Sequence, residues 1–107
     1  MNSTPNLRTI VEDKSFSEDL NELSHKYNVT DIEEVKRCID WMLARNPSSF
    51  DPIPDYSGYY ILKTTDIGVT ISTLPSFRVV FRYNEKKDPN NVHLVAIAEV
   101  VIPEEEQ

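Results

Sequence analysis

The sequence has few of the residues that build covalent, metal-bound or phosphate-cradling sites. Its 107 residues include a single cysteine, Cys38, which excludes an intramolecular disulfide. The two histidines, His25 and His93, are far apart in the chain, so no zinc-type ligand spacing exists and no metal or other cofactor is expected. The two glycines, Gly58 and Gly68, are too few for a glycine-rich phosphate loop.

Long hydrophobic runs are also missing. The longest apolar stretch, residues 92–102, is interrupted by His93 and Glu99 and falls well short of the roughly 20 residues of a membrane-spanning helix. Residues 1–6 are polar and lack the apolar core of a signal peptide. We therefore expect no membrane partner and a cytoplasmic location.

Positive charge is scarce as well. The chain has 11 Lys and Arg against 18 Asp and Glu, a net charge of −7, which argues against a broad nucleic-acid-binding surface. Residues 59–83 are the exception, because they contain Lys63, Arg78 and Arg82 but only one acid, Asp66. A small nucleic-acid contact in this segment is therefore compatible with the acidic composition.

A short strand and an amphipathic helix are predicted at the start of the chain. Residues 7–11 are β-branched and half apolar, which favours a strand. Ser15 and Glu18 have the spacing of a capping box, which predicts the start of a helix. The apolar stripe of that helix repeats at intervals of three and four residues and consists of Phe16, Leu20, Leu23 and Tyr27. Asn28 is expected to end it.

A second helix is predicted to follow at once. Thr30 and Glu33 form another capping box, and Pro47 is expected to stop the helix. Its apolar stripe consists of Ile32, Val35, Ile39 and Met42, with Leu43 beside it. Two helices joined by so short a link should form an antiparallel hairpin, and their apolar stripes need a further layer to cover them.

The second half of the chain predicts strands. Residues 47–58 contain three prolines and form an ordered connector to this half. Strands are predicted at residues 59–64, 77–83 and 92–102, with a further extended stretch at 69–73 and a polar turn at 84–91. The last strand is apolar on both faces, which is typical of a central strand.

These elements predict an α+β fold in one domain spanning residues 1–107. The order is a strand, a two-helix hairpin and three or four mainly antiparallel strands, with the helices packed on one face of a small curved sheet. Residues 1–6 and 103–107 are expected to be frayed tails.

One cluster of side chains stands out as a candidate site. Arg78 and Arg82 share a face of their strand by alternation, and Lys63 lies on a strand that can pair nearby, with Tyr59 and Tyr60 close to it in sequence. Cations and aromatic rings on one sheet face can hold a phosphate backbone and stack on bases. The alternative is that both arginines pair with carboxylates and cover the sheet with their aliphatic stems.

Four segments of the sequence resemble the RelE/ParE superfamily of bacterial type II toxins. The most specific is LPSFRVVFRY (residues 74–83), followed after a turn by VHLVAI (92–97). FSEDL (16–20) and YILK (60–63) fit the same pattern, and the match runs from about residue 7 to residue 101. The resemblance implies a helical hairpin packed on a curved sheet, in agreement with the pattern of predicted elements.

The resemblance also implies site residues. RelE-like members cut mRNA on the ribosome without a metal, using lysines of the second strand and an arginine of the third. Lys63 and Arg78 match these catalytic positions. Arg82 has no established catalytic counterpart in the family, and Arg82 and Tyr60 are the candidate substrate-binding residues from the cluster of cations and aromatic rings. The basic C-terminal segment of the family is replaced here by AEVVIP (98–103), so the catalytic set is incomplete, and the acids at Glu99 and 104–106 are expected near the substrate phosphate.

Three functions stay open at this point. The first is a toxin-family domain that binds proteins and is neutralised by a cognate antitoxin, with DNA gyrase as one toxic target of such families and a homodimer as a further expectation. The second is a ribosome-dependent mRNA endonuclease that uses Lys63 and Arg78. The third is a non-toxic regulatory or binding domain that retains only the fold.

Overall fold

The computed structural model describes residues 7–68 and 74–100 of the chain. In chain order, its elements are β1 (Thr9–Glu12), α1 (Lys14–Lys26), α2 (Val29–Arg45), β2 (Asp51–Pro52), β3 (Tyr59–Lys63), β4 (Phe77–Asn84) and β5 (Asp88–Glu99). Two short 3₁₀ turns, Pro47–Ser49 and Thr64–Ile67, precede β2 and follow β3.

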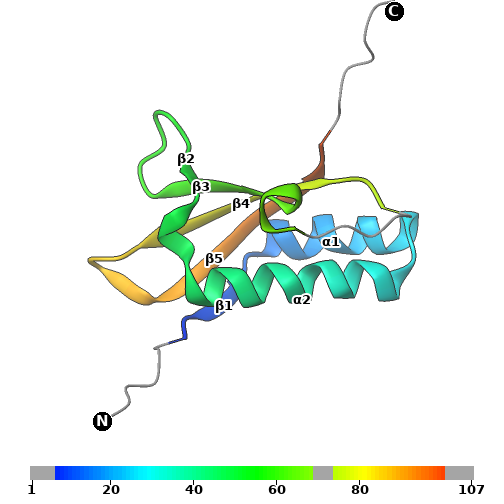
Figure 1. The fold of residues 1–107 in the computed structure, drawn as a ribbon, viewed down its shortest axis with the longest axis horizontal. Helices are drawn as coiled ribbons and strands as arrows, with labels where there is room; N and C mark the ends of the chain where they lie inside the picture. The colour runs from blue at the N-terminus through cyan, green and yellow to red at the C-terminus, as the bar shows by residue number, and fades with distance from the viewer. Residues whose placement is uncertain (1–6, 69–73, 101–107) are drawn as a thin grey trace, which may run out of the picture.

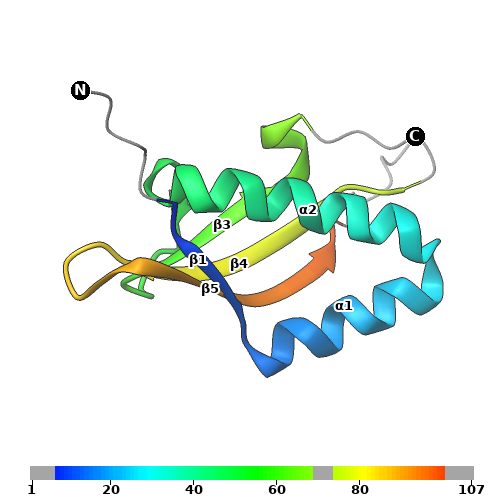
Figure 2. The same cartoon turned by 90° about the horizontal axis from the view of Figure 1, so that it is seen from below.

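The described strands form a five-stranded sheet in the order β1-β5-β4-β3-β2. β1 runs parallel to β5, and the other neighbouring strands are antiparallel. Both helices cover the same face of this sheet, as Figures 1 and 2 show from two sides. The predicted α+β class and the central position of the last strand are confirmed.

α1 does not begin at the predicted capping box. Asp13 is its N-cap residue, and Ser15 lies inside the first turn. The Ser15 hydroxyl donates a hydrogen bond to the carbonyl oxygen of Val95 in β5 at 2.5 Å. The predicted cap at Ser15 is therefore wrong, because an acceptor on the sheet takes the hydroxyl that the local pattern assigns to the helix end.

α2 begins at a cap that the sequence pattern misses. The side-chain oxygen of Asn28 accepts hydrogen bonds from the backbone N–H groups of Thr30 (2.9 Å) and Asp31 (3.2 Å). The predicted cap at Thr30 is thus wrong by two residues, although α2 ends at Arg45, just before Pro47, as expected. In the part of the chain that the structure describes, neither helix is long and apolar enough to cross a membrane.

The connector after α2 contributes a strand that was not predicted. Asp51 and Pro52 pair with Ile61 and Tyr60 of β3 and so form the edge strand β2. A two-residue strand carries no readable alternation, and an edge position tolerates a proline because no ladder partner needs its missing N–H.

The β4–β5 hairpin is longer than the pattern predicts. Asn84 pairs with Asp88, so the predicted turn over residues 84–91 shrinks to residues 85–87. This end of the hairpin projects past the helices (Figure 1), where polar side chains suit a ribbon with water on both faces. The predicted stretch at 69–73 and both predicted tails lie outside the described residues.

The core lies between the helices and the sheet. The alternation predicted along β4 is confirmed, because Phe77, Val79, Phe81 and Tyr83 are buried and Arg78 is exposed. Both helices bury residues of their predicted stripes, and β3 and β5 contribute further side chains. The hydrophobic core therefore also includes Phe16, Leu23, Ile32, Val35, Ile39, Leu43, Leu62, Val92, Leu94 and Ile97. The helices therefore bury the core on one face of the sheet, and the functional residues are to be sought on the other face.

Candidate functional site

The sheet face opposite the helices, which we call the open face, carries three rows of side chains. Residues that pair across neighbouring strands point to the same face of a sheet. Across β3, β4 and β5, the first row is Lys63–Arg78–Ala98, the second is Ile61–Val80–Ala96 and the third is Tyr59–Arg82–His93. An apolar row thus separates a cationic row from a row that combines an aromatic ring, a guanidinium and an imidazole.

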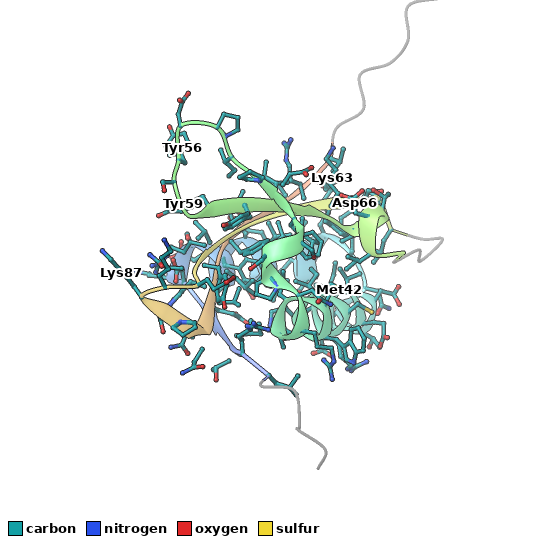
Figure 3. The ribbon with its side chains drawn as sticks, turned by 60° about the vertical axis from the view of Figure 1, so that its left-hand side comes forward. Met42, Tyr56, Tyr59, Lys63, Asp66 and Lys87 are labelled. Carbon is teal, nitrogen blue, oxygen red and sulfur yellow. The ribbon has the colours of Figure 1, made fainter. Side chains whose placement is uncertain are left out.

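The first row is built around two exposed cations. Lys63 and Arg78 are direct cross-strand neighbours, and both are exposed. In Figure 3, Lys63 lies at the end of β3, with Met42 of α2 on the other side of the sheet. Among the described residues, neither cation has an ion-pair or hydrogen-bond partner. Like charges directly opposite each other destabilise a sheet, and an anion bound between them would relieve that repulsion.

Two residues of the third row, Arg82 and His93, lie close to carboxylates. The Arg82 guanidinium lies 3.5 Å from the carboxylate of Asp13. The His93 ring lies between the same Asp13, 3.8 Å from its Nδ1, and Asp88, 3.5 Å from its Nε2. Tyr59 completes the row on β3. The two arginines of β4 therefore differ: Arg82 pairs with an acid, while Arg78 has no such partner within residues 7–68 and 74–100.

Tyr60 does not join the other predicted site residues. Its ring stacks on Phe81, with 5.5 Å between the ring centroids, and it packs against the core on the helix-covered face. The structure therefore brings Lys63, Arg78 and Arg82 together on the open face and places Tyr59 there instead. Strand alternation could have predicted this, because Tyr60 and Lys63 are three positions apart, and residues an odd number of positions apart in a strand point to opposite faces.

Glu99 also lies away from the open face. It pairs with Phe77 in the sheet ladder, and its carboxylate accepts hydrogen bonds from Lys26 Nζ (2.6 Å) and the Tyr27 hydroxyl (2.7 Å) of α1. These two hydrogen bonds hold the pKa of Glu99 below its ordinary value. Glu99 therefore lies on the opposite face of β5 from the row of Lys63 and Arg78, and Lys26 pairs with its negative charge.

A pocket of about 250 Å³ opens at the third row. It lies between the start of β3, the end of β4 and the start of β5, and is lined by Ser57, Gly58, Tyr59, Arg82, Tyr83, Asn84, Asp88, Asn91 and His93. Gly58 has a φ of 85°, a backbone conformation that glycine adopts readily, and this lets the chain turn tightly into β3. The sequence pattern missed this pocket, because its residues come from three separate segments.

The chemistry available on the open face is that of cations and polar donors. Within residues 7–68 and 74–100, no group of three or more His, Cys, Asp or Glu side chains is arranged to hold a metal ion. Lys63 and Arg78 can bind an anion such as a phosphate, for which a guanidinium offers several N–H donors in a fixed plane.

Comparisons with known proteins bear on the fold. No protein-family model matches the sequence, and no curated protein matches it significantly. The structure, however, has the fold of the RelE toxins of toxin–antitoxin pairs. A helical hairpin on one face of a small sheet, with the opposite face left open, is the arrangement expected from the family resemblance.

Three of the structures to which the chain is similar come from Mycobacterium tuberculosis and E. coli. A chain of the RelBE2 toxin–antitoxin complex from Mycobacterium tuberculosis gives a TM-score of 0.62 at 14% identity, covering 92% of this chain and 98% of that one. The isolated RelE toxin of E. coli gives 0.59 at 12% identity, covering 91% and 88%. A free E. coli RelE with two arginines replaced by alanine gives 0.58 at 14% identity, covering 87% and 83%. At sequence identities this low, the structural similarity establishes the fold alone. The activity has to be argued from this chain's own residues.

Proposed function

We propose that this chain is the toxin of a toxin–antitoxin pair, that an antitoxin protein neutralises it, and that its toxic surface is the open face. The shared fold supports the antitoxin as partner, because one of the similar structures is a toxin–antitoxin complex. The open face is the surface that the chain's own helices leave uncovered. A partner that covers it would block access to Lys63 and Arg78.

The toxic activity that the geometry favours is cleavage of RNA, with the ribosome as its setting. A single observation carries this choice: Lys63 and Arg78 lie opposite each other, exposed and free of carboxylate partners among the described residues. Like charges directly opposite each other on neighbouring strands repel, and a bound anion would relieve that repulsion. Inhibition of DNA gyrase and homodimer formation stay predictions.

The proposed reaction is attack of a ribose 2′-hydroxyl on the adjacent phosphate. A bond forms between the 2′-oxygen and phosphorus, the bond to the 5′-oxygen breaks, and the proton lost from the 2′-hydroxyl is balanced by one gained at the leaving oxygen. Lys63 and Arg78 hold the phosphate and stabilise the negative charge that builds up on it in the transition state. Water accepts the proton of the 2′-hydroxyl and water donates one to the leaving 5′-oxygen, because the Arg78 guanidinium stays protonated and cannot act as a base.

Induced expression followed by mapping of mRNA 5′ ends tests this function. We expect the wild type to arrest growth and to produce new 5′ ends. Lys63→Ala and Arg78→Ala should each lower cleavage by roughly a hundredfold, the usual effect of removing one group that stabilises transition-state charge. Lys87→Ala is the matched control, because Lys87 is equally exposed but lies at the turn between β4 and β5 (Figure 3).

Two outcomes would contradict the proposal. Cleavage and growth arrest that persist in Arg78→Ala and Lys63→Ala would rule out the catalytic roles. Growth that is indifferent to overexpression of the wild type would favour the non-toxic binding domain instead. Co-purification from the native host tests the antitoxin separately, and recovery of no small protein partner would count against neutralisation.

A further inference from the structure

We propose that the pocket at the third row binds one unpaired nucleobase of the RNA whose backbone crosses Lys63 and Arg78, and so makes cleavage depend on sequence. This inference rests on the proposed function, since it concerns the same open face and the same substrate. The pocket is lined in part by Tyr59, Arg82 and His93, all of which belong to that row.

The position of the pocket fits a substrate that extends along β4. Arg82 lies four residues from Arg78 on the same face, which is about 13 Å at roughly 3.3 Å per strand residue. Between them lie Ile61, Val80 and Ala96, a half-buried apolar row that offers no competing hydrogen bonds. A phosphate at Arg78 and a base in the pocket therefore belong to different nucleotides of one strand, with sugar or base carbon atoms over the apolar row.

The pocket is large enough for one nucleobase and smaller than the usual site of a drug-sized ligand. Sites for drug-sized ligands have volumes of about 300–1,000 Å³, and this pocket has about 250 Å³. Single-stranded RNA is read in this way, by bases that leave the stack, pack against aromatic, histidine or arginine planes and form hydrogen bonds through their edges. Tyr59, Arg82 and His93 provide one plane of each of these kinds.

The polar groups of the pocket suit the edge of a base. Arg82 uses Nη2 toward Asp13, and its Nε and Nη1 have no partner among the described residues, so both are donors for a ring nitrogen or carbonyl oxygen. Asn91 donates from Nδ2 to Asp88 at 2.8 Å, which leaves its amide oxygen as an acceptor for an N–H group. A base carries both kinds of group side by side.

The charges of the pocket argue against a phosphate as its occupant. Asp88 lines the pocket, and Asp13 lies against both Arg82 and His93. These two carboxylates offset the positive charge of Arg82 and would repel a second anion. Within residues 7–68 and 74–100, no carboxylate forms an ion pair with Lys63 or Arg78. The first row is therefore suited to the phosphate and the third row to a neutral ring with N–H donors.

Cleavage mapping with pocket variants tests the inference. The wild type should show a preference for one base at a constant distance from the cut. Tyr59→Ala and His93→Ala should each lower cleavage at preferred sites by about tenfold, the usual effect of losing one stacking partner, and flatten the preference. Tyr59→Phe should restore it, because the ring is kept. Trp41→Ala is the aromatic control, since Trp41 lies on α2 and is 55% exposed.

A second measurement separates this inference from the proposed function. The full-length protein, labelled with nitrogen-15, is titrated with adenosine, cytidine, guanosine and uridine, which carry a base but no phosphate. We expect one of them to shift the amide resonances of residues 57–59 and 91–93 and to leave those of α2 unchanged. In Tyr59→Ala and His93→Ala, these shifts should be lost.

The outcomes distinguish the two failures. If Lys63→Ala and Arg78→Ala abolish cleavage while Tyr59→Ala and His93→Ala keep the wild-type base preference, the function stands and the pocket inference is overturned. If the chain cuts no RNA but a nucleoside shifts the pocket resonances, the function fails and the pocket remains a base-binding site. Absence of both cleavage and nucleoside binding overturns both.

Discussion

At the scale of single residues, neighbours decide what a side chain does. Arg78 and Arg82 occupy the same face of one strand, yet Asp13 lies 3.5 Å from Arg82 and no described carboxylate pairs with Arg78. Sequence alternation places both arginines on that face, but it says nothing about which acid a distant segment brings to it. This difference is the reason for proposing phosphate binding at Arg78, with Lys63, and base recognition beside Arg82.

Lys36 shows the same dependence on neighbours in a different setting. Its Nζ lies 2.9 Å from Glu12 and 2.7 Å from Asp40. Burial by itself raises the pKa of Glu12, but hydrogen bonds from Lys36 and Ser17 outweigh it and hold the pKa below its ordinary value of 4.5. Burial raises the pKa of Asp40, and here Lys36 offsets it only in part. The Oδ1 atom of Asp40 is buried with no hydrogen-bond partner.

The two acids should therefore respond to pH with opposite signs. The folded pKa of Glu12 is lowered, so its contribution to stability is present above pH 4.5 and is lost as the pH falls through the folded pKa. We expect Glu12→Gln to lower the free energy of unfolding by about 1 kcal/mol at pH 7 and by less below pH 4. Urea unfolding at several pH values measures the difference.

Asp40→Asn serves as the matched variant for this pH series. Because the folded pKa of Asp40 is raised, its protonated form favours the folded state, and that contribution is lost as the pH rises through the folded pKa. The neutral amide should therefore leave stability at pH 7 within about 0.5 kcal/mol of wild type. A loss larger than that of Glu12→Gln would contradict these assignments.

The aromatic residues Phe16 and Trp41 differ strongly in how far they are buried. Phe16 is fully buried between α1 and the sheet, whereas Trp41 is 55% exposed and stacks on the Arg45 guanidinium, 4.0 Å from its ring centre. We expect Phe16→Ala to lower the free energy of unfolding by about 3–5 kcal/mol and Trp41→Ala by less than about 1 kcal/mol. Denaturant unfolding of both variants checks this order, and equal losses would contradict it.

At the scale of elements, the apolar stripes of the helices can be predicted from the sequence, but the first residues of the helices cannot. The stripes follow from the 3.6-residue period, which any helix must obey whatever it packs against. The caps depend on one hydrogen bond each, and Ser15 finds its acceptor in β5 instead of in its own helix. Local sequence therefore places both helices correctly and misplaces their first residues.

The cap of α2 offers a direct test of this distinction. Asn28→Ala removes the side-chain oxygen that accepts two backbone N–H groups, so it should lower the free energy of unfolding by about 1 kcal/mol. Thr30→Ala should change it by less than about 0.5 kcal/mol, since Thr30 takes part in the cap through its backbone only. A larger loss in Thr30→Ala than in Asn28→Ala would restore the predicted capping box.

At the scale of the whole molecule, acidity and a small basic site coexist. The net charge of −7 belongs to the chain as a whole, while Lys63 and Arg78 stand together on the open face. Glu99, an acid that the sequence places close to this site, is held on the other side of the sheet by Lys26 and Tyr27. Overall acidity therefore excludes a broad nucleic-acid surface and permits a narrow one.

The salt dependence of RNA binding should reflect this narrow contact. Each phosphate neutralised on a single strand contributes a slope of about −0.7 to a plot of log affinity against log salt concentration. Lys63 and Arg78, together with Arg82, whose charge Asp13 partly compensates, would neutralise two or three phosphates. We therefore expect a slope between about −1 and −2. Fluorescence anisotropy of a short labelled RNA measures it, and Arg78→Ala should make the slope shallower by about 0.7. A slope steeper than about −4 would require a broad basic surface that the open face lacks.

The sequence by itself determined the order of both helices and of β1, β3, β4 and β5, the apolar stripes of the helices, the buried face of β4 and the α+β class. These features depend on periodicities of two and 3.6 residues along a continuous segment. Only the tertiary structure decided the pairing of Lys63 with Arg78, the burial of Tyr60 against Phe81 and the pocket beside Arg82. Cross-strand register depends on which distant segments meet, and packing of the core as a whole selects that register.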